Sequence, residues 1–435
     1  MRLSTSRRLL ALAALPLLAL GACVGDGDDL LTEAPAGAAG GALFERYVAL
    51  GNSITAGFQS GGIVDSLQAR AYPVLLSQRA GNFNFGIPWL AKPGCPAPFT
   101  APFTPQTGVP ACALRVADPD SVPTYVQNLA VPGVRIADLF AIPSGSIAQL
   151  YTLVTGGRTQ VQAMIDAEPT FVSVWIGNND ALNAVASGVL GPLAAGADSN
   201  LTRLAPFQAR VTELAGAINA SGAQGAALVG VVNAIQFAPI VQPGAFFFLA
   251  RDVTTRRFNG KLVNDNCSPV NNLGQPNPLA ANLVSFQAVT STAIPEINCD
   301  PAQQGGLFLL DQTEIAVITA RINAYNAALQ AAAAANNWVY VDPNTIFAPQ
   351  LTTRTSGRTN QIRKCIDLAT ATTAAQFQAA VLNTCPVTGA TAAPNLFGAL
   401  ISLDAVHPSS AAHVLFANAL AAAINARYGT TLATS

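Results

Sequence analysis

The sequence predicts an α/β protein in which helices cover both faces of a parallel sheet. Two observations support this prediction. Short apolar runs with strand composition alternate along the chain with longer helical stretches, an order typical of parallel sheets. The chain has 435 residues, of which 51% are hydrophobic and 10% charged, so it can bury a sizeable core.

The expected strands are short and apolar. They cover residues 46–50, 170–176, 226–235 and 338–341, with a weaker run at 125–130. Gly51 ends the first of them. The expected helices are longer and cover residues 71–80, 146–167, 201–220, 312–336 and 409–428. The alanine-rich run 330–335 favours helix, and Ser409 marks the start of the last helix.

Two long irregular segments interrupt this alternation, near 82–123 and 236–310. Both exceed the usual length of a connection between regular elements. We interpret them as insertions at the rim of the functional site, without cores of their own, and not as separate domains.

A serine follows the first expected strand in a glycine-bounded turn, Gly51-Asn-Ser-Ile-Thr55. Ser53 should therefore lie at the carboxyl edge of the sheet, where open α/β sheets bind their ligands. A hydrolytic enzyme of this class would hold its nucleophile at that edge.

Three further stretches can supply an oxyanion hole and a base: Asn128-Leu-Ala-Val-Pro-Gly133, Gly177-Asn-Asn-Asp180 and Asp404-Ala-Val-His-Pro408. Together with the Ser53 turn they resemble, in content and order, the four sequence blocks of the SGNH hydrolase superfamily, the GDSL esterases and lipases. The resemblance spans Leu50 to His407. It implies a flavodoxin-like three-layer α/β/α sandwich and a serine ester hydrolase. One position departs from the family pattern, because Asn52 replaces the usual aspartate before the nucleophile.

A serine hydroxyl needs a base to remove its proton during attack, and histidine fits because its ordinary pKa lies near neutrality. The chain has two histidines. His413 lies inside an Ala/Leu-rich helical stretch, and we interpret it as a core or surface histidine. His407 precedes the last helix, and Asp404 three residues earlier can fix its tautomer. We therefore predict that Ser53, His407 and Asp404 form a catalytic triad.

The resemblance assigns the oxyanion hole to the backbone N–H of Ser53, the backbone N–H of Gly133 and the side-chain amide of Asn179. Such donors stabilise the negative charge that forms on the carbonyl oxygen during ester hydrolysis. We expect Asn128 and Asp180 to be supporting or capping groups. No metal site is expected, because the chain has two histidines and no CxxC motif. The mechanism needs no organic cofactor.

The expected activity is hydrolysis of carboxylic esters of lipids or short acyl chains through an acyl-enzyme. One alternative is O-deacetylation of a polysaccharide or glycoconjugate by the same mechanism. Another is a non-catalytic surface lipoprotein that binds a ligand, which only Asn52 favours. We interpret the aromatic run 246–249 as core in preference to an acyl pocket.

The first 22 residues are predicted to be a lipoprotein signal peptide. Three arginines precede the apolar run 9–20, which is too short to span a bilayer. Leu20-Gly-Ala-Cys23 then resembles a lipobox, so Cys23 would be lipidated. Residues 23–43 would form a flexible tether, followed by the hydrolase domain at 44–435. The alternative is an ordinary secretory signal peptide. In that case Cys23 would be a seventh unmodified cysteine, whereas its lipidation leaves six, an even number that can pair in disulfides.

These features predict an exported lipoprotein anchored to a membrane. Val24 does not match the acidic retention signal of inner-membrane lipoproteins, so we favour the outer membrane of a Gram-negative bacterium. The net charge of −1 argues against a nucleic-acid partner. We expect a monomer whose partners are an ester substrate and the membrane.

The six remaining cysteines predict a disulfide framework, with fifteen possible connectivities. They cluster in three pairs that are local in sequence, which favours Cys95–Cys112, Cys267–Cys299 and Cys365–Cys385. Each pair falls in an irregular stretch that a closed loop would stabilise by roughly 2–4 kcal/mol.

Overall fold

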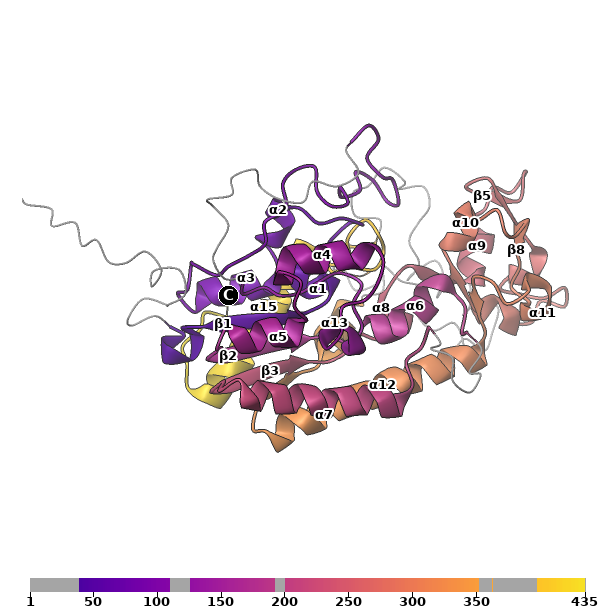
Figure 1. The fold of residues 1–435 in the computed structure, drawn as a ribbon. Helices are drawn as coiled ribbons and strands as arrows, with labels where there is room; N and C mark the ends of the chain where they lie inside the picture. Colours follow the sequence, from indigo (N-terminus) through magenta and orange to yellow (C-terminus); the bar gives the residue numbers. More distant parts are fainter. Residues whose placement is uncertain (1–38, 110–125, 192–199, 352–361, 363–396, 435) are drawn as a thin grey trace, which may run out of the picture.

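The computed structural model describes residues 39–109, 126–191, 200–351, 362 and 397–434 (Figure 1). Four parallel strands form the central sheet in the order β1-β2-β3-β10. Their bounds are β1 Tyr47–Gly51, β2 Phe171–Trp175, β3 Gly225–Val229 and β10 Val339–Val341. The predicted α/β fold with a central parallel sheet is thus confirmed.

The central strands are buried on both faces, which explains why their sequences are apolar. Every residue of β1, β2 and β3 is buried. In the register of β1 and β2, Tyr47 lies opposite Phe171 and Gly51 opposite Trp175. The two strands therefore end level, and the loops that follow them leave the sheet at the same edge.

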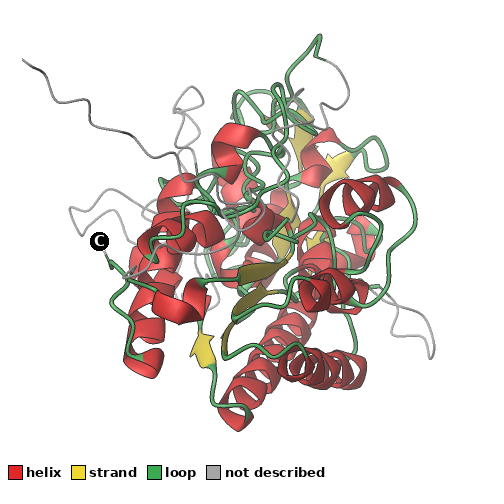
Figure 2. Ribbon diagram, turned by 60° about the vertical axis from the view of Figure 1, so that its left-hand side comes forward, coloured by secondary structure: helices red, strands yellow, loops and turns green. Residues whose placement is uncertain are grey.

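Helices cover both faces of the sheet (Figures 1 and 2). On one face α3 (Tyr72–Arg79) and α15 (Ser410–Tyr428) pack together. Trp175 of β2 contacts Tyr72 and Phe416 on these helices, with ring centroids 5.4 and 4.6 Å apart. The other face is covered by α5 (Gln160–Asp166), α7 (Leu204–Ala220) and α12 (Gln312–Ala335).

Two strand predictions differ from the structure, one in its extent and the other in that no strand forms among the described residues. The strand expected at 226–235 ends at Val229, and the chain then forms a loop and the short helix α8 (Ala234–Phe237). Its apolar character continues because the loop and α8 also line the interior. The weak run at 125–130 forms no strand among its described residues. Asn128 makes a single parallel bridge to Ala49 at the edge of the sheet.

The helix expected at 146–167 is two helices, α4 (Ser146–Thr155) and α5. Gly156 and Gly157 lie between them with φ of 65° and 80°. This left-handed conformation ends a helix and favours glycine. Shorter helices elsewhere are α1 (Ser53–Ala56), α2 (Asp65–Gln68), α6 (Asn179–Ser187), α10 (Gln287–Thr290), α11 (Pro301–Gln304) and α13 (Pro343–Phe347).

The second insertion has a hydrophobic core of its own, so the expectation that it lacks one was wrong. Two small sheets build it, in the orders β4-β7-β9 and β5-β6-β8. Their strands are β4 Val241–Pro243, β5 Arg257–Phe258, β6 Lys261–Val263, β7 Leu283–Ser285, β8 Glu296–Ile297 and β9 Leu309–Leu310. The aromatic run lies in α9 (Gly244–Ala250), where Phe246 and Phe247 are buried in this core. The interpretation of the run as core is therefore confirmed for these two residues, whereas Phe248 is partly buried and Leu249 is exposed.

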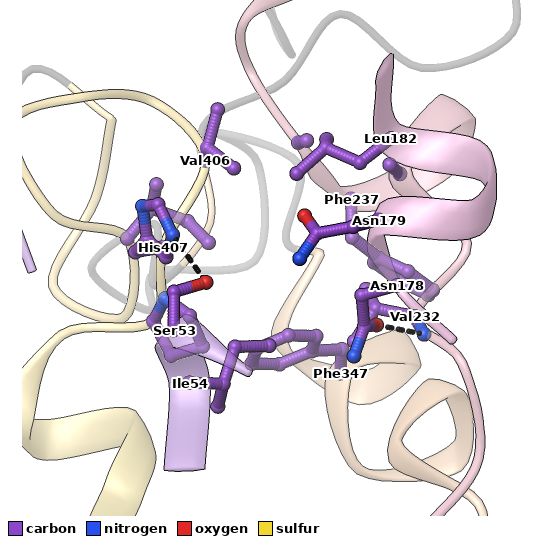
Figure 3. Close-up of a pocket in the computed structure, with 14 residues that line it drawn as sticks. Ser53, Ile54, Asn178, Asn179, Leu182, Val232, Phe237, Phe347, Val406 and His407 are labelled. Atoms are coloured by element: carbon purple, nitrogen blue, oxygen red, sulfur yellow. Dashed lines mark hydrogen bonds between the residues drawn. The ribbon is translucent and has the colours of Figure 1, made fainter. Parts of the chain in front are cut away.

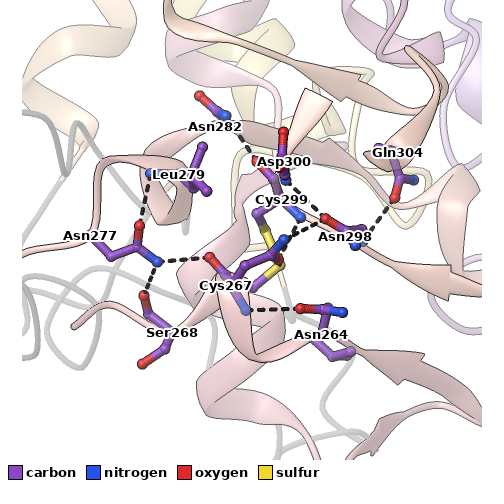
Figure 4. Close-up of a disulfide and its surroundings, with 12 residues drawn as sticks. Asn264, Cys267, Ser268, Asn277, Leu279, Asn282, Asn298, Cys299, Asp300 and Gln304 are labelled. Carbon is purple, nitrogen blue, oxygen red and sulfur yellow. Dashed lines mark hydrogen bonds between the residues drawn. A yellow bond between two sulfur atoms is a disulfide. The ribbon is translucent and has the colours of Figure 1, made fainter. Parts of the chain in front are cut away.

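The predicted disulfide Cys267–Cys299 is present and lies in the same core (Figure 4). Side-chain amides hold the chain around it. Asn282 donates to the carbonyl of Cys299 over 3.0 Å, and Asn277 donates to the carbonyl of Ser268 over 2.8 Å. The bond thus joins two segments that hydrogen bonds also fix.

Other predictions concern residues outside the described part of the chain. Cys95 is disulfide-bonded, but Cys112 lies outside the described residues, as do Cys365 and Cys385. The signal peptide and Cys23 also lie outside them. Among the described residues, no helix has both the length and the apolar character needed to cross a bilayer.

Candidate active site

Ser53 is the first residue of α1, directly beyond the end of β1. Gly51 is required there, because a Cβ would come within 2.6 Å of the carbonyl oxygen of Trp175. Gln160 holds this end of the strand, since its amide accepts from the N–H of Gly51 and donates to its carbonyl, both over 3.0 Å. Asn52 caps α1 by accepting from the N–H of Ile54 over 3.1 Å. An aspartate would cap in the same way, so Asn52 preserves the turn.

The three residues predicted as a triad form a continuous hydrogen-bonded chain (Figure 3 shows its Ser53 end). Nε2 of His407 lies 2.9 Å from Oγ of Ser53. Nδ1 of His407 lies 2.8 Å from Oδ2 of Asp404. Phe58 packs against the imidazole with ring centroids 4.8 Å apart, which restricts its orientation. Residues separated by 354 positions in the sequence thus meet at one edge of the sheet.

Asp404 is buried and stays ionised. Its Oδ1 accepts from the N–H of Val406 and of His407, over 2.9 and 2.8 Å, and its Oδ2 also accepts from the N–H of Gly61 over 2.6 Å. Burial alone would raise the pKa of Asp404, but the charge and hydrogen bonds of His407 and the N–H of Val406 lower it to about 2. At pH values well above 2, a fixed negative charge therefore faces Nδ1 of the imidazole.

Both insertions hold the loop that carries Asp404. From the first, the N–H of Phe103 donates to the carbonyl of Leu403 over 3.1 Å. From the second, the N–H of Ile240 donates to the carbonyl of Ala405 over 3.0 Å. The insertions thus support the loop from two directions.

Of the predicted oxyanion donors, Asn179 lines the same pocket as Ser53, and Gly133 is not among the described residues that line it. Asn179 begins α6 directly after β2 and lines the same pocket as Ser53 and His407. Its amide donates to the carbonyl of Val134 over 2.8 Å, which leaves a second N–H for a ligand, and it faces Ser53 in Figure 3. Gly133 lies in an exposed turn with φ of 85°, a conformation that favours glycine.

Asn128 and Asp180 support this arrangement. The amide of Asn128 donates to the carbonyl of Thr55 over 2.9 Å and so ties the second block to α1. Oδ2 of Asp180 accepts from the N–H of Ile136 over 2.9 Å. Burial raises the pKa of Asp180 to about 6, although the hydrogen bond from the N–H of Ile136 by itself lowers it.

His413 lies in the core, away from the reacting groups. It is fully buried, and its Nδ1 accepts from the N–H of Tyr72 over 3.2 Å. Within the described residues its Nε2 has no hydrogen-bond partner. Burial, with a smaller contribution from His407, lowers the pKa of His413 to about 3. The side chain is therefore neutral at ordinary pH, as expected of a core histidine.

The pocket at Ser53 is small, about 30 Å³. Most of its walls are apolar, from α1, α6, α8, α13 and the loop before His407. No group of His, Cys, Asp and Glu within the described ranges is arranged to hold a metal ion. The polar atoms available for chemistry in the pocket are those of Ser53, His407 and the asparagines at the start of α6.

The sequence reasoning missed residues that only support the site. Oγ of Ser402 donates to Oδ1 of Asp404 over 3.0 Å and accepts from the N–H of Ser60 over 2.9 Å. The role of Ser402 could have been predicted from its position two residues before Asp404, because a serine at that spacing can donate to the carboxylate. Gln160 gave no such signal, because it begins α5 and its neighbours Thr159 and Gln162 are polar as well.

The sequence model of the family described as GDSL-like lipase/acylhydrolase matches residues 47–420. The chain belongs to this family. The match includes the four blocks that carried the resemblance, so this GDSL-family protein is a carboxylic ester hydrolase with the esterase or lipase activity of its family.

Several solved structures are similar to this GDSL hydrolase at low identity. A mutant of an acetylxylan esterase from Geobacillus stearothermophilus is 13% identical with a TM-score of 0.36, covering 87% of this chain and 93% of that one. An α/β hydrolase from the metagenome of Lake Arreo, Spain, is 14% identical with a TM-score of 0.35, covering 90% and 97%. An extracellular lipase from Streptomyces rimosus is 16% identical with a TM-score of 0.29, covering 69% and 81%. No curated protein matches the chain. Similarity at this level says nothing about the substrate, and the family assignment rests on the family match.

Proposed function

We propose that this GDSL hydrolase is a serine esterase that works through an acyl-enzyme. The observation that carries the proposal is the hydrogen-bonded chain from Ser53 through His407 to Asp404. His407 takes the proton of Ser53 as the hydroxyl attacks the ester carbonyl, and then gives it to the departing alcohol. Asp404 orients the imidazole and stabilises its charged form. Water then attacks the acyl-enzyme by the same route and releases the acid.

The oxyanion would be held by the N–H of Ser53, the N–H of Gly133 and the amide of Asn179. Negative charge builds on the carbonyl oxygen only as the reaction proceeds, so donors fixed in advance lower the barrier selectively. The position of Asn179 at the start of α6, on the pocket wall, supports this assignment.

The substrates in this proposal are neutral esters of lipids or short acyl chains. O-deacetylation of a polysaccharide or glycoconjugate is a second candidate, favoured by the small volume beside Ser53. A non-catalytic binding protein would have no need of an ionised carboxylate aligned behind a histidine that contacts a serine.

Labelling with an ethoxy fluorophosphonate tests the serine mechanism. We expect one covalent adduct, located at Ser53 by peptide mass spectrometry. The variants Ser53→Ala and His407→Ala should lose the label, whereas His413→Gln should keep it because His413 lies in the core. A wild-type protein that is folded but unlabelled would contradict the proposal.

We also propose that the mature enzyme is lipidated at Cys23 and held at a membrane, in the outer membrane of a Gram-negative bacterium. The support is the lipobox at the end of the signal peptide. Two acyl chains suffice for stable anchoring, whereas a single chain binds only marginally. Cys23→Ser should give a soluble exported form or an uncleaved precursor in membrane fractionation. An intact, unlipidated N-terminus in the wild type, found by mass spectrometry, would refute this assignment.

A further inference from the structure

We propose that the acyl side of this active site accepts acetyl-sized groups and rejects hexanoyl and longer chains. This inference rests on the proposed serine mechanism, which fixes where the two halves of an ester lie. Among the proposed substrates it selects short-acyl and acetyl esters and excludes lipid esters with long acyl chains. His407 must reach the departing alcohol oxygen, so the alcohol lies on the His407 side. The acyl group then extends away from His407, into the space above Ile54 and Phe347 (Figure 3).

The volume of the pocket limits the length of the acyl group. The space that Ser53, Asn179 and His407 line measures about 30 Å³. In the same measure the cavity beside the second insertion has about 890 Å³, so the space at the nucleophile is narrow by comparison. An acetyl group adds only one methyl beyond the carbonyl carbon. Each further methylene would bring the chain closer to the floor and the wall of this space.

The floor of the pocket is a buried aromatic ring. Phe347 ends α13 and is 1% exposed. Its ring packs against Phe237 and Phe416, with centroids 5.7 and 5.0 Å apart. A longer acyl chain would have to displace this ring from the core. Close-packed interiors resist such added volume.

The wall beside Phe347 is held by three asparagines from different elements. The successive N–H groups of residues 231–233 donate to the side-chain oxygens of Asn326, Asn178 and Asn344, over 2.6, 3.0 and 2.7 Å. The amides of Asn326 and Asn344 also donate to the carbonyl of Val231, both over 3.0 Å. Moving this wall outward would break several partly buried hydrogen bonds. The pocket is therefore small and also resistant to widening.

The chemistry of the walls favours a neutral acyl group. The apolar side chains that line the space include Ile54, Leu182, Val232, Phe237, Phe347 and Val406. Within the described part of the chain, no Asp, Glu, Lys or Arg lines it. A charged acyl group such as succinyl would be buried without a partner, at high cost. The methyl of an acetyl ester meets no such penalty.

A second, larger cavity provides a matched control. It measures about 890 Å³ and lies against the second insertion, with Phe246, Phe258 and Phe286 among its lining residues. Neither Ser53 nor His407 lines it. A phenylalanine in this cavity can be shortened in the same way as Phe347 without enlarging the space at the nucleophile.

The test measures kcat/KM for p-nitrophenyl acetate, butyrate, hexanoate and octanoate. We expect the wild type to hydrolyse the acetate at least about tenfold better than the hexanoate, since overpacking a filled site is costly. Phe347→Leu should raise the hexanoate-to-acetate ratio several-fold, and Phe286→Leu should leave it unchanged. Asn344→Ala should raise the ratio as well by loosening the wall, which provides a second variant if Phe347→Leu folds poorly. Circular dichroism checks each variant.

A wild type that hydrolyses the hexanoate as well as the acetate would overturn the inference. So would folded Phe347→Leu and Asn344→Ala variants with the wild-type ratio. Ethoxy fluorophosphonate labelling separates this failure from failure of the serine mechanism. A labelled Ser53 with a flat chain-length profile refutes the acyl limit alone, whereas an unlabelled Ser53 refutes both.

Discussion

Replacing His413 by glutamine should remove the largest acid-sensitive contribution to the stability of this hydrolase. The imidazole is fully buried, and protonation would add a proton to Nδ1, the atom that accepts from the N–H of Tyr72, so that hydrogen bond would be lost. Its pKa is about 3 in the folded protein, against about 6.5 in an unfolded chain. The unfolded chain therefore takes up the proton first. The stability that depends on the neutral form is fully present above pH 6.5 and is lost as the pH falls toward 3, by roughly 5 kcal/mol in total.

Protonation of Asp180 has the opposite effect on stability as the pH falls, so its contribution must be separated from that of His413. Burial raises its pKa to about 6, so its ionised form destabilises the folded protein at pH 7. This cost is relieved as the pH falls through 6. Between pH 7 and 4.5, His413 should remove about 3 kcal/mol of stability and Asp180 should restore about 2 kcal/mol. Asp404, with a pKa of about 2, is ionised throughout this range and contributes little.

Urea unfolding at pH 7 and pH 4.5, at equal ionic strength and followed by tryptophan fluorescence, separates the two groups. The wild type should lose about 1 kcal/mol between these pH values, His413→Gln should gain about 2 kcal/mol, and Asp180→Asn should lose about 3 kcal/mol. Glutamine can still accept from the N–H of Tyr72, and ester hydrolysis should stay near the wild-type rate. If wild type and His413→Gln change stability in parallel, the buried imidazole is not the acid-sensitive group.

Three other predictions concern the reaction and the second insertion. Asn179→Ala should lower kcat for p-nitrophenyl acetate by roughly a hundred- to a thousand-fold with a smaller effect on KM; equal effects on both would argue against an oxyanion role. Ser53→Ala and His407→Ala should each remove nearly all turnover, and the double variant should be no slower than either, because both remove one reaction path. Replacing Cys267 and Cys299, which lie 32 positions apart, by serine should lower the free energy of unfolding in urea by roughly 3–4 kcal/mol, while the activity of the molecules that stay folded is largely retained.

The sequence was sufficient to predict the sheet and the reacting groups, because both leave local signals. The strands are buried on both faces and so are apolar throughout, and Ser53 and His407 stand in short motifs with fixed spacing. The limits of elements were predicted less well. The strand expected at 226–235 was too long, because a buried loop is as apolar as a strand.

The shape of the pocket could not be predicted from the sequence. Asn326 and Asn344 bind the backbone of a loop that lies about a hundred positions away, and asparagines in a helix or turn usually have local roles. Phe347 forms the pocket floor only because α13 packs against α15. Such contacts depend on the tertiary arrangement and leave no pattern within a short window of sequence.

The distance along the chain between Ser53 and His407 also fixes when the enzyme can first act. The two residues are separated by 354 positions, so a ribosome adding roughly 5–20 residues per second takes about 20–70 s to pass from one to the other. During that interval the growing chain carries the nucleophile without its base. Any product of translation that stops before His407 is therefore unable to hydrolyse esters by this mechanism, however well its sheet has folded.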